Sequence, residues 1–118
     1  MAIETVDARI LSKMAEYDSA TVQNAGIVAR GGYVGAEMDY SGPGLARMVG
    51  GGVVVGYAVT GELSPITEPE SYLDWNEFHD QIMYADAPVI VVLKDADPVP
   101  GRGAIIGDGM ACRFTAMG

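Results

Sequence analysis

The run Val-Ile-Val-Val-Leu-Lys at residues 89–94 constrains the fold of this chain more than any other feature. Successive side chains of a strand point to opposite faces, so a continuous apolar run is typical of a strand covered on both faces, as in parallel sheets. Residues 53–63 form a second strand-like segment, β-branched and apolar, with glycines at residues 50–52 and at Gly61 as its boundaries. We predict a strand at each segment, with Gly56 marking a bulge or a close approach of another backbone.

The segment between these strands, residues 67–85, has the clearest helical pattern. Thr67 and Glu70 match a capping box, and Pro69 falls in the first turn, where its missing N–H costs nothing. The expected apolar stripe, interpreted as core packing, consists of Tyr72, Trp75, Phe78 or His79, and Ile82. A short strand at residues 104–106 and a final helix follow, so the order of elements predicts an α/β fold with parallel pairing.

Two helical segments and a loop are predicted before the strands. The first segment carries apolar residues at helical spacing, namely Ile10, Leu11, Met14 and Tyr17. Asp18 or Ser19 is placed to cap a second helix, which Gly31 and Gly32 end. The glycine-rich residues 31–52 predict a loop with a short strand or turn. With 118 residues, 49% of them apolar, and no repeat or linker, we predict a single domain over residues 1–118.

Charge and apolar patterning exclude several classes of partner. Seven basic and sixteen acidic residues give a net charge of −9, which repels nucleic-acid phosphates. No apolar run reaches the roughly 18 residues of a membrane helix, and the N-terminus lacks the basic region of a signal peptide. Cys112 has no partner for an internal disulfide. We expect a cytoplasmic protein that binds neither membranes nor nucleic acid.

Three features invite a functional interpretation that the local pattern does not favour. His79 is the only histidine and has no second His or Cys at ligand spacing, so we interpret it as a histidine on a helix face without a catalytic role. Asp95 and Asp97 carry oxygens suited to a cation, but a solvated turn is the simpler interpretation. The glycines of residues 50–56 precede their strand, and no Lys-Ser/Thr follows them, which excludes the Walker and dinucleotide patterns.

The turn Gly107-Asp108-Gly109 is different because it follows a predicted strand and opens a helix. Free N–H groups and the helix dipole at such a position favour a carboxylate or a phosphate. Asp108 is suited to capping the helix or to acting as an acid or base, and the residues alone leave both roles open. The helix itself is expected to pack through residues at i, i+4 and i+7, which are Met110, Phe114 and Met117.

Three blocks of the chain, in this order, resemble the RraA-like family: Tyr17–Ala25, Val53–Leu63 and Ala87–Gly118. That family groups regulators of ribonuclease E with class II pyruvate aldolases that cleave 4-hydroxy-4-methyl-2-oxoglutarate. In the last block the family has a strand, then Gly-Glu or Gly-Asp, then a helix that ends in glycine. The resemblance implies a swivelling β/β/α domain with a mixed sheet and flanking helices.

The resemblance also implies a chemistry for the last block. In similar enzymes, the main-chain amides of the turn, here Gly107, Asp108, Gly109 and Met110, hold the carboxylate of pyruvate or another 2-oxo acid. The acidic residue, here Asp108, takes part in proton transfer. Mg²⁺ or Mn²⁺ polarises the pyruvoyl oxygens and stabilises the enolate, and oxaloacetate decarboxylation passes through the same enolate. The family is sometimes labelled as methyltransferases, but this sequence has no glycine-rich loop placed to bind S-adenosylmethionine, so it does not support that activity.

The chain departs from the family pattern at its last residue. The family continues with a buried strand and an Asp-Gly-x-x-Arg-Asp motif, whose arginine binds substrate and whose aspartate anchors the metal. Gly118 matches the helix-ending glycine, so the resemblance implies an incomplete domain that binds no metal and is inactive alone. Two function classes follow, a metal-dependent lyase acting on 2-oxo acids and a non-catalytic regulator of the ribonuclease E inhibitor type.

An oligomer is expected for two reasons. Related proteins form trimers with active sites between subunits. The family's further strand, expected beside residues 89–94, would be missing, which leaves unpaired N–H and C=O groups along a strand edge. The predicted assembly is therefore a homotrimer, or else an oligomer in which the copies exchange their C-terminal helices.

Overall fold

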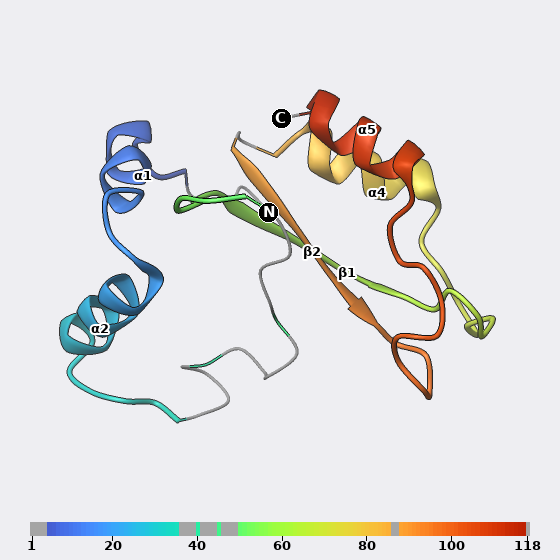
Figure 1. Cartoon of the computed structure of the whole chain (residues 1–118), viewed down its shortest axis with the longest axis horizontal. Helices are drawn as coiled ribbons and strands as arrows, with labels where there is room; N and C mark the ends of the chain where they lie inside the picture. The colour runs from blue at the N-terminus through green and yellow to red at the C-terminus, as the bar shows by residue number, and fades with distance from the viewer. Residues whose placement is uncertain (1–4, 36–39, 41–44, 46–49, 86–87, 118) are drawn as a thin grey trace. The chain divides into compact units, whose positions relative to one another are not determined.

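The computed structural model describes residues 5–35, 40, 45, 50–85 and 88–117 (Figure 1). The chain divides into two compact units, residues 1–55 and 56–118, which are described separately. That residues 1–118 form a single domain stays a prediction.

The first unit contributes two helices, α1 (Ala8–Met14) and α2 (Ser19–Ala29), each capped by an aspartate (Figure 1). The Asp7 carboxylate accepts the N–H of Arg9 at 2.8 Å and also pairs with the Arg9 guanidinium. The Asp18 carboxylate accepts the N–H of Thr21 at 2.7 Å, which satisfies one of the amides that a helix start leaves unpaired. Both predicted helices are confirmed, and Asp18 is the cap of the second.

The end of α2 is made by Gly31 and Gly32, as the sequence predicts. Gly31 has φ +86°, a left-handed conformation that favours glycine. Its N–H donates to the Val28 carbonyl, and the Gly32 N–H donates to the Ile27 carbonyl at 2.9 Å. These two bonds form a Schellman motif, which pairs carbonyls that the helix end would otherwise leave free. Most of the glycine-rich loop predicted over residues 31–52 lies outside the described residues.

The second unit is built on two parallel strands with a helix between them. Strand β1 (Tyr57–Leu63) pairs with β2 (Val89–Asp95) in the register Tyr57 with Val89 through Leu63 with Asp95. Helix α4 (Trp75–Met83) lies in the crossover, and α5 (Asp108–Met117) follows β2. Parallel strands require such a crossover, so the general α/β class is confirmed.

Strand β1 begins four residues later than predicted, at Tyr57. The first bond of its ladder runs from the Tyr57 N–H to the Pro88 carbonyl at 2.8 Å. A side chain at Gly56 would place a Cβ 2.7 Å from that same carbonyl oxygen. Of the two predictions for Gly56, a bulge or a close approach of another backbone, the close approach is confirmed. The partner strand determines where β1 starts.

Helix α4 packs on one face of the sheet through a glycine inside β1. Figure 1 shows α4 and α5 on the same side of the two strands. A Cβ at Gly61 would lie 3.1 Å from Cε2 of Phe78 and 3.3 Å from Cδ2 of Leu93. Gly61 thus lies within the strand instead of bounding it, and its missing side chain lets the Phe78 ring approach the sheet.

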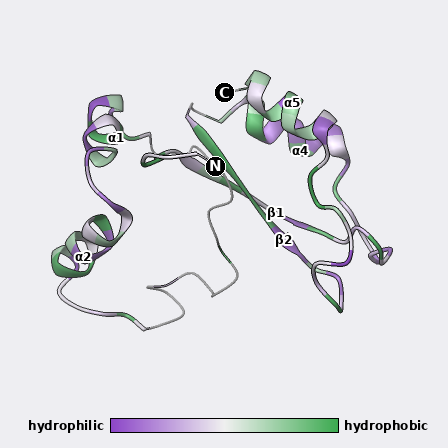
Figure 2. Cartoon of the chain, in the orientation of Figure 1, coloured by the Kyte–Doolittle hydropathy of each residue, from purple (hydrophilic) through white to green (hydrophobic). Residues whose placement is uncertain are grey.

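The opposite face of the sheet is only partly shielded within the described residues, which contradicts the prediction that residues 89–94 are covered on both faces. Val92 on this face is 45% exposed. Its neighbours Glu62 and Lys94 form an exposed ion pair at 2.7 Å. Figure 2 shows β2 hydrophobic from its start and hydrophilic at its carboxyl end. The apolar run thus predicted the strand correctly, but it did not predict that one face of the strand is partly exposed.

Helix α4 also begins later than predicted, and the capping box at Thr67 and Glu70 does not form. Asp74 is the N-cap, and its carboxylate accepts the N–H of Asn76 at 2.8 Å, while Glu77 lies in the first turn. The Thr67 N–H is engaged by the Asp97 carboxylate. Tyr72 precedes the helix and is 80% exposed, so it takes no part in the core. Phe78, His79 and Ile82 form the buried face of α4.

Helix α5 matches its predicted packing, but the short strand before it is absent. Residues 104–106 have no strand structure, because the ladder of β1 and β2 ends before them and no described strand pairs with them. Within α5, only Met110, Phe114 and Met117 are half-buried and the other described side chains are exposed. The predicted i, i+4, i+7 face is confirmed.

The contact between Gly61 and Phe78 predicts how a single methyl group changes stability. Gly61→Ala should lower the free energy of unfolding by about 1–3 kcal/mol, because the ring of Phe78 and the side chain of Leu93 must give way. Gly109→Ala is the matched control, since its Cβ would meet nothing within 4 Å and alanine favours a helix. Urea denaturation of both variants measures the difference. Equal stability of the two would contradict the packing described.

Candidate functional site

The turn that opens α5 presents four backbone N–H groups. The Ala111 N–H donates to the Gly107 carbonyl at 3.0 Å, which makes Gly107 the N-cap residue and Asp108 the first residue of the helix. The N–H groups of Gly107, Asp108, Gly109 and Met110 therefore have no carbonyl of α5 to bond. These are the four residues predicted to hold a carboxylate.

Asp108 lies in this turn but is not its N-cap residue. Its Oδ1 accepts the N–H of Gly109 at 2.8 Å, so the side chain folds back on its own helix start. No other group among the described residues accepts from the N–H groups of Gly107, Asp108 or Met110. Gly107, Asp108 and Gly109 are exposed, which leaves the turn open to a small anion.

Asp97 lies in the loop after β2, and its interpretation as part of a solvated turn is wrong. It is only 6% exposed. Its Oδ2 accepts the N–H of Ile66 at 3.0 Å and its Oδ1 accepts the N–H of Thr67 at 2.9 Å. The carboxylate thus joins the loop after β1 to the loop after β2. Sequence reasoning missed this role because the donors are backbone amides about thirty residues away.

The surroundings of Asp97 lower the pKa of its carboxyl group. Burial by itself raises that pKa because it disfavours the charged form. Hydrogen bonds from Thr67 and Ile66, together with the positive charge of Arg102, outweigh this effect and bring the pKa below its ordinary value of 3.8. Asp97 is therefore a charged group held inside the loops.

Asp95 shapes the loop around Asp97. Its Oδ1 accepts the N–H of Asp97 at 3.0 Å, and its Oδ2 accepts the N–H of Gly101 at 2.6 Å. Both aspartates considered as cation ligands in the sequence thus accept backbone amides. A cavity of about 70 Å³ lies beside them, with Ile66, Thr67, Asp97, Pro98, Val99 and Arg102 as its lining.

His79 lies in a cluster of aromatic rings between α4 and α5. Its ring stacks on Trp75, with centroids 5.5 Å apart, and lies 6.0 Å from the ring of Phe114. It is 8% exposed, and its Nε2 has no hydrogen-bond partner in the described part of the chain. The predicted apolar stripe included Phe78 or His79, and both residues are buried.

The described residues do not fit the divalent metal that the resemblance implies. Among them, no three His, Cys, Asp or Glu side chains gather in a group able to hold a metal ion. Asp108, the carboxylate of the turn, accepts its neighbour's amide instead.

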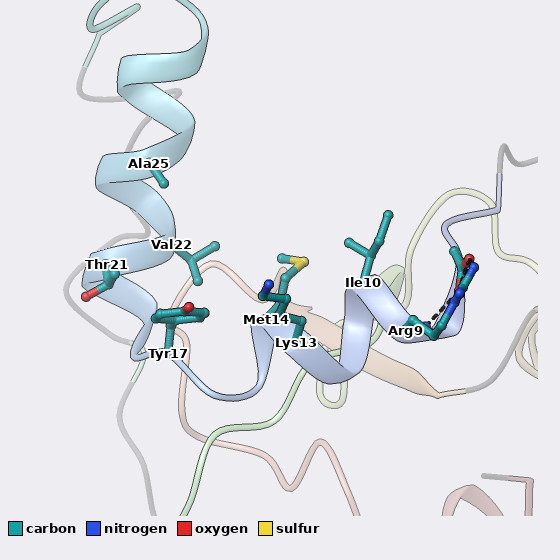
Figure 3. A pocket seen from close by; sticks show the side chains of 9 residues that line it. Arg9, Ile10, Lys13, Met14, Tyr17, Thr21, Val22 and Ala25 are labelled. Atoms are coloured by element: carbon teal, nitrogen blue, oxygen red, sulfur yellow. Dashed lines mark hydrogen bonds and ion pairs between the residues drawn. The ribbon is translucent and has the colours of Figure 1, made fainter.

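The first unit contains an apolar groove between α1 and α2. It has a volume of about 660 Å³, and Figure 3 shows the side chains along it. Its lining comprises Asp7, Arg9, Ile10, Lys13, Met14, Tyr17, Thr21, Val22 and Ala25. Ile10 on α1 is 53% exposed, and Tyr17, between the two helices, is 45% exposed, so apolar surface of this groove faces outward. Sequence analysis predicted these residues as helix faces but not a groove between them.

Comparisons with known proteins leave the family open: no protein-family model, curated protein or solved structure matches this chain. The RraA-like resemblance therefore depends on the residues quoted for it. Within the described ranges, none of the helices has the length and apolar character needed to cross a membrane.

The lowered pKa of Asp97 predicts an acid-sensitive stability. A carboxyl group whose pKa is lower in the folded chain than the roughly 3.9 of an unfolded one stabilises the fold above that value. The stabilisation is lost as the pH falls through the folded pKa. We expect the urea midpoint to fall between about pH 5 and pH 2, and Asp97→Asn to remove part of that dependence. An identical pH dependence in the variant and the parent protein would refute this role.

Proposed function

We propose that this chain is an RraA-like protein of the class II pyruvate aldolase and oxaloacetate decarboxylase type, which binds a 2-oxo acid. The observation that carries the proposal is the turn Gly107–Met110, where four N–H groups without a helical carbonyl meet an exposed carboxylate. The order of β1, α4, β2 and α5 is consistent with the swivelling domain of that family. The proposed family rests on the quoted sequence blocks, and the proposed binding of a carboxylate rests on the turn.

The main-chain amides would bind the carboxylate of the 2-oxo acid. A helix N-terminus favours an anion through its N–H groups and its dipole, and hydrogen bonds to a charged acceptor are stronger than neutral ones. The N–H of Gly109 is already engaged by Asp108. A bound carboxylate would compete for that amide and release the Asp108 side chain, which then lies next to the ligand and can hold or deliver a proton.

Turnover requires more than these residues. In the family, Mg²⁺ or Mn²⁺ supplies the polarisation of the 2-oxo acid's oxygens. The described residues offer no ligand group for it. We therefore propose that residues 1–118 bind the 2-oxo acid without cleaving it.

Pyruvate binding to the turn can be measured by NMR titration. We expect the amide signals of Gly107–Met110 to shift with pyruvate and those of α2 to stay in place. Gly109→Pro removes one N–H, whereas Gly109→Ala adds a Cβ in the same open space and keeps it. The proline variant should bind roughly tenfold more weakly than the alanine variant, as expected for one hydrogen bond to a charged group. Equal affinities would rule out the amides as the binding site.

A second candidate function is that of a non-catalytic regulator of the ribonuclease E inhibitor type. The observation that favours it is the groove between α1 and α2, where Ile10 and Tyr17 expose apolar surface. Apolar surface of this kind is common where one protein binds another. The homotrimer implied by the resemblance would likewise need an interface, and it remains a proposal.

Capture of a ribonuclease E-type protein tests the regulator. We expect Ile10→Glu to reduce capture at least tenfold, because a charge at the centre of an apolar interface is costly to bury. Val28→Glu, on an exposed side chain of α2 outside the groove, is the control and should retain capture. Equal capture by both variants would exclude the groove as the binding surface.

A further inference from the structure

The backbone ladder between β1 and β2 ends at the bond from the Ala96 N–H to the Leu63 carbonyl, at 2.8 Å. Beyond it the two chains leave the sheet as separate loops. Asp97 is the next residue, and its carboxylate bonds Ile66 and Thr67 across the gap. The side chain thus continues the connection between the strands where the ladder stops.

We propose that the Asp97 carboxylate is a latch that holds the loop after β1 against the loop after β2 and so positions the chain that enters α5. One carboxylate accepting two backbone amides fixes both loops at once, and its burial keeps water from competing for those bonds. Asp95 bonds the amides of Asp97 and Gly101, which gives the loop the shape that directs Asp97 inward. Arg102 adds a positive charge that favours the ionised latch.

The latch reaches α5 through a second contact between the same loops. A Cβ at Gly103 would lie 2.7 Å from Cβ and Cγ of Pro65, so the Pro65 ring lies directly against the backbone of Gly103. Only residues 104–106 separate Gly103 from the N-cap Gly107. The other side of α5 is held where the Phe114 ring meets His79. The turn Gly107–Met110 therefore lies between two fixed points, and Asp97 maintains the first.

The latch also bears on the proposed binding turn, and this part of the inference rests on the proposed function. If four amides bind one carboxylate, their spacing and direction must be set before the ligand arrives. Asp97 would be a positioning residue for that turn. It touches no ligand itself.

Backbone ¹⁵N order parameters of the full chain test the latch. We expect values near 0.85 for residues 103–109 in the parent protein and below about 0.6 in Asp97→Ala, with α4 unchanged. Asp74→Ala is the matched control, because it also removes a carboxylate that accepts a backbone amide in the same unit. It should leave residues 103–109 rigid. A residue needed only for overall stability would not loosen these residues selectively in the folded state.

Two outcomes would overturn the latch: residues 103–109 that stay rigid in Asp97→Ala, and a loss of order throughout the second unit. Should Asp97→Ala not fold, Asp97→Asn decides by the same criteria, since its amide keeps one acceptor and should give an intermediate loss of order. A pyruvate titration of the parent protein separates the two proposals. If pyruvate does not shift the amides of Gly107–Met110 while the order parameters change as expected, the proposed function fails and the latch stands.

Discussion

The parallel pairing of β1 with β2 determines most of what the second unit can do. Parallel neighbours cannot be joined by a tight turn, so the chain must cross over one face of the pair, and α4 makes that crossing. The crossing in turn requires a helix to approach the sheet closely, which Gly61 permits by leaving room for the Phe78 ring. Both strands also end on the same side, so their following loops meet there. The Asp97 contacts and the entry to α5 are consequences of this arrangement.

The two loops illustrate how charge can organise backbone that no ladder reaches. Loop amides that leave a sheet need acceptors, and here aspartate side chains supply them. Asp95 bonds within its own loop, whereas Asp97 bonds across to the other. Asp108 follows the same pattern at the start of α5. The acidic composition of the chain thus has a local structural use that its net charge does not reveal.

Sequence patterns predicted those elements that depend on local chemistry. The ends of α2 follow from Asp18 and from Gly31 with Gly32, because caps act within a few residues. The packed face of α5 follows from its periodicity. The predicted start of α4 at Thr67 was wrong because Asp74 also carries a capping carboxylate and caps the helix instead. The amide of Thr67 is bonded to Asp97, thirty residues further along the chain. The start of β1 could not be predicted because it depends on the carbonyl of Pro88, which immediately precedes the other strand. The burial of Asp97 could not be predicted because it depends on two loops that are brought together only in the folded chain.

The His79 Nε2 has no hydrogen-bond partner among the residues that the structure describes, and this has a consequence for the motion of α5. Water can reach Nε2 only if the surrounding rings separate, and Phe114 on α5 is one of them. A hydrogen bond between water and that nitrogen would offset some of the free energy that separating the rings costs. Local opening of α5 is therefore easier than its apolar contacts alone would suggest. The helix that carries the open turn can therefore part from His79 at a lower cost in free energy than its apolar contacts imply, while the sheet stays folded.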